Sequence, residues 1–186
     1  PAPMDVPPLL LIRPSTADDV PRLAAIYADS VRHGTGTFEL DAPDDAEMAR
    51  RRDAVLASGW PWLAAERAGR VVGFAYAAPF RPRRAYRWCV EDSIYLDADT
   101  RGLGIGRLLL ADLAARCTAL GARRMIAVIG DSANAASIGV HRACGFAPAG
   151  VLDACGWKLG RWLDVVMMQR ALGEGAAGEP RDAAAA

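Results

Sequence analysis

The chain has no excess of charge of either sign, since 22 basic residues balance 22 acidic ones among its 186 residues. A protein that holds nucleic acid through a broad positive field needs an excess of lysine and arginine, so this balance argues against nucleic acid as a partner. Lysine itself is nearly absent, because Lys158 is the single one. We attribute the preference for arginine to genome composition and draw no function from it.

Residues that hold metals or form disulfides are also few. The chain has four cysteines and two histidines, and none of them lies at the spacing of a metal site. We therefore expect no metal, no disulfide scaffold and four reduced thiols. The cysteines are Cys89, Cys117, Cys144 and Cys155, and the histidines are His33 and His141.

Long apolar runs are missing as well, so no segment is expected to cross a bilayer. The first eight residues also lack the basic and apolar regions of a signal peptide, which favours a cytoplasmic protein without a membrane partner. The length and the 52% apolar content are enough for one domain with a sizeable core. We expect this domain over residues 9–172, after a flexible N-terminus (1–8) and before a disordered tail (173–186) of Gly, Ala, Glu and Pro without pattern.

Seven strand-like segments and four helical ones alternate irregularly along the chain. The strands are expected at residues 9–13, 60–66, 71–78, 86–96, 124–129, 146–152 and 162–169. The helices are expected to begin near Thr16, Asp44 or Asp45, Gly104 and Asn134. This order fits neither a strict β-α alternation nor an all-β protein. It predicts an α/β fold of the α+β type, with a mixed, mostly antiparallel central sheet of about seven strands and helices on both faces.

A glycine-rich loop joins the fourth strand to the third helix and indicates a phosphate site. Glycines let the backbone approach a ligand, and a helix that begins just after them presents unpaired N–H groups. A Walker loop is excluded because Gly106 is followed by Arg107 and Leu108 rather than by Lys and Ser or Thr. A dinucleotide-binding fingerprint fits poorly, because Gly102, Gly104 and Gly106 have the wrong spacing and lie in mid-chain.

The pattern R-x-x-G-x-G, filled by Arg101, Gly104 and Gly106, resembles the coenzyme A pyrophosphate loop of the GNAT acetyltransferases. The resemblance spans about residues 9–170, and it is closest to the phosphinothricin and methionine sulfoximine N-acetyltransferases. Stretches that carry it lie at residues 35–39, 79–82, 86–87, 90–91, 93–95, 134–138, 145–146 and 158–164. One residue departs from this pattern, because the family usually has His where this chain has Asp92.

The resemblance implies that acetyl-CoA is the co-substrate and assigns residues to it. The main chain at 94–96 would pair with the pantetheine arm, and the loop and the start of the fourth helix would bind the rest. The implied cofactor-binding residues are Ile94, Tyr95, Leu96, Arg101, Gly102, Leu103, Gly104, Ile105, Gly106, Asn134 and Ser137. Without the resemblance, Asn134 reads as a helix cap and Arg101 as an exposed loop residue.

Two residues are candidates for proton transfer. Glu91 is the candidate general base, because a carboxylate partly withdrawn from water has a raised pKa and can accept an ammonium proton. Its alternative role is an exposed strand residue paired with an arginine. His141 could protonate the leaving thiolate or relay a proton, and its alternative role is a capped histidine on a helix face.

An arginine cluster after the third strand indicates an acceptor with an anionic or polar group, since the guanidinium binds such groups at two points. The implied acceptor-binding residues are Thr37, Phe38, Arg81, Pro82, Arg83, Glu91, Asp92 and Ser93. The resemblance also implies a homodimer, with the acceptor site completed at the interface.

The sequence therefore predicts an N-acetyltransferase that acts on a small amino acid analogue such as phosphinothricin, methionine sulfoximine or methionine sulfone. The acetyl group is expected to pass by direct attack, because no base partner for Cys89 is evident. The alternatives are an acetyltransferase for a polyamine, an aminoglycoside or a protein N-terminus, a non-catalytic acyl-CoA sensor, and a generic nucleotide-binding module. The arginine cluster argues against polycationic acceptors.

Overall fold

The computed structural model describes residues 10–180, so the expected flexible N-terminus at 1–8 lies outside the described residues, as does the end of the expected tail at 181–186. The element order is the predicted one. The elements are β1 (Leu10–Pro14), α1 (Val20–His33), α2 (Asp45–Ala57), β2 (Trp62–Arg67), β3 (Arg70–Pro79), β4 (Cys89–Leu96), α3 (Ile105–Ala119), β5 (Arg124–Gly130), α4 (Ala135–Ala143), β6 (Ala147–Lys158) and β7 (Arg161–Ala171), with short 3-10 turns η1 (Ala17–Asp19), η2 (Arg84–Tyr86) and η3 (Ala98–Thr100).

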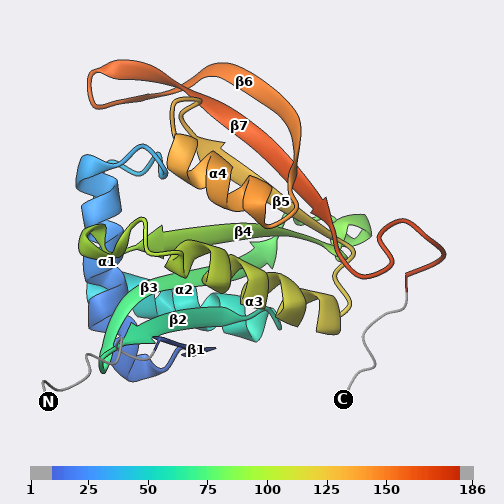
Figure 1. Ribbon diagram of the computed structural model, residues 1–186, viewed down its shortest axis with the longest axis horizontal. Coiled ribbons are helices and arrows are strands. Elements are labelled where there is room, and N and C mark those ends of the chain that lie inside the picture. Colours follow the sequence, from blue (N-terminus) through green and yellow to red (C-terminus); the bar gives the residue numbers. More distant parts are fainter. Residues whose placement is uncertain (1–9, 181–186) are drawn as a thin grey trace, which may run out of the picture.

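The strands form one seven-stranded sheet in the order β1-β2-β3-β4-β5-β7-β6. The pair β4–β5 is parallel, and the other neighbouring pairs are antiparallel. Leu23 and Ile26 of α1 pack on one face with Trp62 and Phe74, whereas α3 packs on the other face. Figure 1 shows α3 and α4 along the sheet. The predicted mixed, mostly antiparallel sheet with helices on both faces is confirmed.

Side chains of β4 alternate between these two faces, as the pleat of a strand requires. Val90 lies in the core under α3, and Ile94 packs against the same core. Tyr95 packs toward α1, where its ring lies 4.8 Å from the ring of Tyr27 in an edge-to-face contact. The strand therefore carries Asp92 to the α3–α4 face and Glu91 to the α1 face.

The sheet opens between its two parallel strands. Pairing between β4 and β5 joins Cys89–Asp92 to Arg124–Ala127 and then ends. Beyond this point residues 93–96 pair with β3 alone, and residues 128–130 pair with β7 alone. One edge of β4 thus presents main-chain N–H and C=O groups to a wedge between the strands.

Two strand predictions were wrong in their lengths. The strand expected from residue 86 begins at Cys89, because Tyr86 N donates to Arg83 O (2.9 Å) and forms a 3-10 turn instead. The last hairpin runs much further than expected. Its two-residue turn at Leu159 and Gly160 has positive φ at both positions (51° and 74°), which matches the twist of the flanking strands.

The two faces of β5 are covered unequally. The strand β5 lies inside the sheet between β4 and β7. Met125, Ala127 and Ile129 are buried on the α3–α4 side, but Val128 on the other side is 36% exposed. The opposite face of β5 is therefore open enough to line a cavity.

Residues 173–180 of the expected tail fold back on the start of β5. Arg123 forms an ion pair with Glu174 (Nη1–Oε2, 3.0 Å) and donates to the carbonyl of Ala177 (3.0 Å).

Among the described residues, no helix has both the length and the apolar content needed to span a bilayer.

Candidate active site

A cavity of about 610 Å³ occupies the wedge between β4 and β5. Its walls come from the end of α1, the glycine loop, the exposed edge of β4, β5 and the start of α4. Predicted site residues that line it are Asp92, Ser93, Ile94, Tyr95, Leu96, Arg101, Gly102, Gly106, Asn134, Ser137 and His141. Predicted residues that do not are Thr37, Phe38, Arg81, Pro82, Arg83, Glu91, Leu103, Gly104 and Ile105.

The glycine loop has the backbone conformation that only glycine adopts without strain. Gly102 and Gly104 both have φ of +79°, and Gly104 is the residue that precedes the first turn of α3. An added Cβ at either position would meet no atom of the protein within 4 Å, so the backbone angle rather than crowding requires glycine. The first turn of α3 has no acidic residue, so its positive end is left free for an anion.

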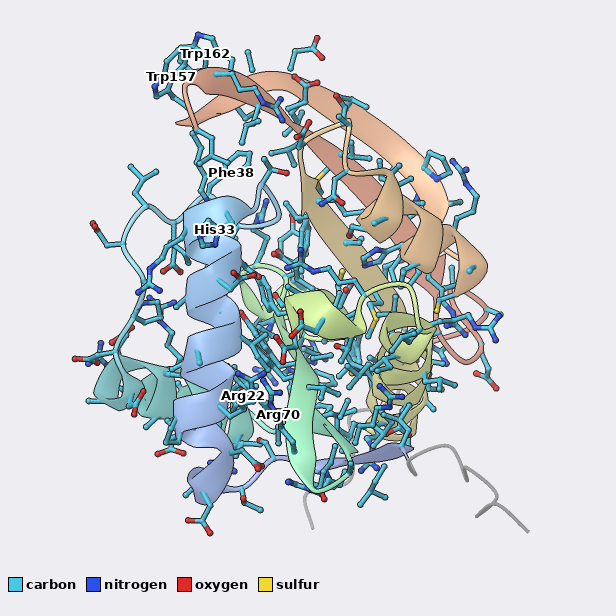
Figure 2. All side chains as sticks on the ribbon, turned by 60° about the vertical axis from the view of Figure 1, so that its left-hand side comes forward. Arg22, His33, Phe38, Arg70, Trp157 and Trp162 are labelled. Carbon is cyan, nitrogen blue, oxygen red and sulfur yellow. The ribbon has the colours of Figure 1, made fainter. Side chains whose placement is uncertain are left out.

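Gly106 differs from these two glycines, because it has no positive φ and lies within the first turn of α3. A Cβ there would make ordinary contacts, 3.4 Å from Leu96 Cδ1 and 3.6 Å from Val140 Cγ2. The first turn of α3 thus lies close to both β4 and α4. The base of the loop is fixed by Asp97, which accepts from Arg22 of α1 and from Arg70 of β3; the two arginines are labelled in Figure 2.

Arg101 lies at the rim of the cavity and is only weakly held. Its Nη2 lies 3.3 Å from Asp29 Oδ2, and Asp29 also accepts from His33 Nδ1 at 2.9 Å. These side chains are exposed, and exposed pairs of this kind contribute about 0–1 kcal/mol. The guanidinium of Arg101 can therefore turn toward a bound phosphate at little cost.

Asn134 caps α4. Its Oδ1 accepts from Ser137 N (3.2 Å), and its Nδ2 donates to Gly130 O (3.4 Å). The structure therefore contains the capping role that sequence reasoning gave as the alternative to a ligand contact. The cap also fixes both residues at the edge of the cavity, where they line its wall.

Glu91 is half-buried on the opposite face of β4 from Asp92. Burial raises the pKa of its carboxyl group, the charge of Arg81 lowers it and the charge of Asp92 raises it, with a net increase. The raised pKa lies closer to neutral pH, which suits a general base that works there. Arg81 itself is exposed, stacks over Phe80 at 4.1 Å and belongs to the same β3–β4 loop as Pro82 and Arg83.

The loop after α1 is tied to the last hairpin. Thr37 is buried, its Oγ1 lies 2.9 Å from Tyr27 Oη, and its carbonyl accepts from Lys158 Nζ at 2.6 Å. The ring of Phe38 lies against Gly130 and Gly156, where an added Cβ would be 2.8 Å and 2.5 Å from ring carbons. Figure 2 shows Phe38 beyond the end of α1, below the hairpin end with Trp157 and Trp162.

Sequence reasoning missed an ion pair in the cavity wall. Asp131 has φ of +74°, accepts from Ala133 N at 2.9 Å and pairs with Arg161 from β7. The hydrogen bond from Arg161, followed by that from Ala133, lowers the pKa of Asp131. The sequence from Asp131 to Asn134 is a recognisable turn signal, but the pairing of Asp131 with Arg161 on β7 could not be predicted without the fold.

Asp92 and His141 form a buried pair across the cavity wall. His141 Nε2 lies 2.9 Å from Asp92 Oδ2, and its Nδ1 lies 2.7 Å from the main-chain carbonyl of Ser137. The ring also contacts Phe146 edge to face at 5.1 Å. Burial alone would lower the pKa of His141, but the hydrogen bond and charge of Asp92 and the carbonyl of Ser137 outweigh it, so the pKa is raised.

Other reactive groups have no comparable arrangement in the described part of the chain. All four cysteines are free thiols. Within residues 10–180, no group of three or more His, Cys, Asp or Glu side chains is placed to hold a metal ion.

Together, the split between two parallel strands and the adjoining glycine-lined helix N-terminus define a site for a ligand with an extended arm and a phosphate end. Comparison with known proteins identifies the class. The model of the acetyltransferase (GNAT) family matches residues 24–146, and the chain belongs to this family.

Relatives extend this assignment over most of the chain. Phosphinothricin N-acetyltransferase of Alcaligenes faecalis is 53% identical over 85% of this chain and 80% of its own length. An L-methionine sulfoximine/L-methionine sulfone acetyltransferase of Pseudomonas paraeruginosa is 41% identical over 85% of this chain and 92% of its own length. The crystal structure of a phosphinothricin acetyltransferase from Sinorhizobium meliloti in complex with AcCoA superposes with a TM-score of 0.90, at 48% identity, over 93% of this chain and 94% of that one.

Proposed function

We propose that the protein transfers an acetyl group from acetyl-CoA to the amino group of a small amino acid analogue, of the phosphinothricin, methionine sulfoximine or methionine sulfone type. The observation that carries this proposal is the cavity at the β4–β5 split, which joins an exposed strand edge to a glycine-lined helix N-terminus. The names of relatives 53% and 41% identical to the chain support the class of acceptor.

The residues around the cavity suit a pyrophosphate and an extended arm. Arg101 to Gly106 provide a loosely held guanidinium, two positive-φ glycines and the free N-terminus of α3. Ile94, Tyr95 and Leu96 provide main-chain groups along the open edge of β4, which would hold the pantetheine arm as an added strand would be held. Asn134 and Ser137 close the site at α4.

Glu91 would accept the proton that the substrate ammonium must lose before its nitrogen attacks, directly or through water. Its burial and raised pKa support this role. His141 would serve the opposite end of the reaction, where the sulfur of coenzyme A gains a proton. Preorganised N–H donors of β4 beside the reacting carbonyl would contribute roughly 3 kcal/mol each to stabilisation of its developing negative charge.

Direct attack is preferred over an acyl-enzyme on the thiol of Cys89. Burial raises the pKa of Cys89, and Glu91 raises it further, against the lowering effect of Arg124 and Arg81. A thiol with a raised pKa is a poor nucleophile at neutral pH. The free thiols also suit a reducing compartment, and a cytoplasmic location is part of the proposal.

The acceptor would bind on the Glu91 side of β4. Arg81, Pro82 and Arg83 are exposed in the adjoining loop and can meet an anionic group. On the same α1 face of the sheet, Thr37 and Phe38 would form the other wall, held by α1 and the last hairpin. The proposed acceptor-binding residues also include Ser93, on the same face of β4 as Glu91, and Asp92, on the opposite face.

A homodimer is part of the proposal. Trp157 and Trp162 are 58% and 61% exposed, and their rings contact each other edge to face at 5.4 Å. They lie at the end of a hairpin whose outer strand, β6, is the edge of the sheet. An exposed aromatic pair on an open edge suits burial against a second copy of this chain. Sedimentation equilibrium should give a dimer mass that falls to the monomer mass in Trp157→Asp.

The activity is tested by release of free thiol from acetyl-CoA with each of the three analogues and with ordinary amino acids. We expect release with at least one analogue. Glu91→Gln should lower turnover about 100-fold or more while acetyl-CoA affinity stays within about twofold. The matched control Glu174→Gln, an exposed residue in the turn after β7, should retain full turnover. Release with protein N-termini alone, or acetyl-CoA binding without release, would instead favour another acetyltransferase or an acyl-CoA sensor.

A further inference from the structure

The hydrogen-bond geometry of the buried pair Asp92 and His141 determines which of its atoms carry protons. Their side chains are 1% and 3% exposed, so neither can rely on water to satisfy a mismatched contact. A carbonyl oxygen only accepts hydrogen bonds. The Nδ1 atom of His141, which lies 2.7 Å from the Ser137 carbonyl, must therefore carry a proton.

The second ring nitrogen then decides the charge of the pair. A neutral imidazole with its proton on Nδ1 has a lone pair at Nε2, and this atom lies 2.9 Å from Asp92 Oδ2. A lone pair facing an ionised carboxylate would be repulsive. The contact is favourable only if one more proton lies between the two groups, either as imidazolium with carboxylate or as imidazole with carboxylic acid.

The remaining groups that face the pair do not supply a positive charge in its place. The titratable side chains that the charge of Asp92 reaches are Glu91 on β4, Cys117 on α3 and Cys144 at the end of α4. These are an acid and two thiols whose pKa values are raised. The proton is thus the charge that balances the Asp92 carboxylate.

One atom of the pair is left for another partner. Asp92 Oδ1 is buried and has no hydrogen-bond partner within the described part of the chain, although such atoms normally have one. Both nitrogens of His141 are already engaged. Asp92 also precedes residues 93–96, the open edge of β4, and it lines the same cavity as they do.

We propose that Asp92 is a catalytic residue, and that it delivers the shared proton to the sulfur of coenzyme A while His141 positions and recharges it. This inference rests on the proposed acetyl transfer. As the amine nitrogen bonds to the acetyl carbon, the carbon–sulfur bond breaks, and the sulfur takes the proton of the pair. Glu91 passes the proton of the substrate ammonium to solvent before the attack, and it then accepts the second proton that the nitrogen loses as the amide forms. Solvent returns one proton to the pair, so that each turnover yields amide, free thiol and one released proton.

Asp92→Asn tests this assignment with little change of shape. An Asn amide can donate to Nε2 of neutral His141, so both contacts of the ring survive while the acidic proton is lost. We expect turnover at saturating acceptor to fall about 100-fold, with acetyl-CoA affinity within about twofold by calorimetry. His141→Gln, whose amide cannot share an acidic proton with Asp92, should give a similar loss. Asp18→Asn, a matched change at an exposed position, should change neither quantity.

A second readout is independent of catalysis. Nitrogen NMR signals of His141 should show the pair still protonated at a pH where an ordinary histidine has lost its proton, and Asp92→Asn should convert His141 to the neutral Nδ1–H tautomer. The proposal is overturned if the pair loses its proton below pH 6, or if both variants turn over like the wild-type protein. If the wild-type protein releases no thiol but the NMR result holds, the proposed function fails and the proton-sharing pair stands.

Discussion

Gly156→Ala should displace the Phe38 ring and, through it, the proposed acceptor wall. Gly156 lies on β6, and its backbone angles are ones that alanine can adopt, so the substitution acts through crowding alone. An added Cβ would lie 2.5 Å from both Phe38 Cδ2 and Cε2, about 1 Å inside ordinary contact. The ring cannot retreat freely, because Gly130 of β5 packs against its Cε1 atom on another side.

Overpacking of this kind costs about 1–3 kcal/mol. At roughly 3 °C per kcal/mol for a chain of this length, the Tm of Gly156→Ala should fall by roughly 3–9 °C. The Michaelis constant for the acceptor should rise several-fold in the thiol-release assay, because Phe38 moves. Affinity for acetyl-CoA should stay within about twofold, since Phe38 does not line the β4–β5 cavity.

Gly150→Ala is the matched control on the same strand. A Cβ at Gly150 would meet no atom within 4 Å, and its φ is also acceptable for alanine. This variant should unfold and turn over like the wild-type protein. If Gly156→Ala matched Gly150→Ala in both Tm and acceptor Michaelis constant, the locked position of Phe38 would be refuted.

Three further predictions concern the fold and the rims of the site. Asp19→Asn should cost about 2 kcal/mol, because it breaks the two-point contact with Arg13 (2.7 and 2.8 Å). The hydrogen bond from Arg13 lowers the folded-state pKa of Asp19, so this stabilisation is complete above the unfolded-state pKa near 4 and is lost as the pH falls through the folded-state pKa. Urea titrations should therefore show the difference in unfolding free energy between the wild-type protein and Asp19→Asn shrinking in acid. Gly104→Ala should cost about 1 kcal/mol at its φ of +79° and weaken acetyl-CoA binding, whereas Gly139→Ala, an open position within α4, should be stabilising by calorimetry. Lys158→Met leaves the buried Thr37 carbonyl without its donor, so thermal unfolding should show a loss of about 1–3 kcal/mol and the acceptor Michaelis constant should rise; an unchanged Tm would contradict this.

Local patterns were enough to predict the element order, because each strand and helix has its own periodicity and end signals. The cap at Asn134 and the positive-φ loop at Gly102 and Gly104 are also local features, and the structure contains both. Their contacts with a ligand remain a prediction.

Contacts between distant segments could not be predicted in this way. The pairing of Asp92 with His141 depends on α4 crossing the face of β4, and that of Asp131 with Arg161 depends on the register of β7. The true length of the last hairpin was missed because Asp153, Ala154 and Gly156 have little strand propensity of their own. Residues 153–155 have no register partner on β7, and the pairing resumes at Gly156 opposite Leu163 and continues to Lys158.

Acetyl transfer to the amino group of a small amino acid analogue can be measured directly. The acceptor is analysed by mass spectrometry after incubation with acetyl-CoA and the purified protein, together with the amount of free thiol released. We predict an N-acetylated phosphinothricin, methionine sulfoximine or methionine sulfone in one-to-one ratio with free thiol, and its near absence with Glu91→Gln. Thiol release without any acetylated analogue, or equal product from Glu91→Gln, would contradict the account.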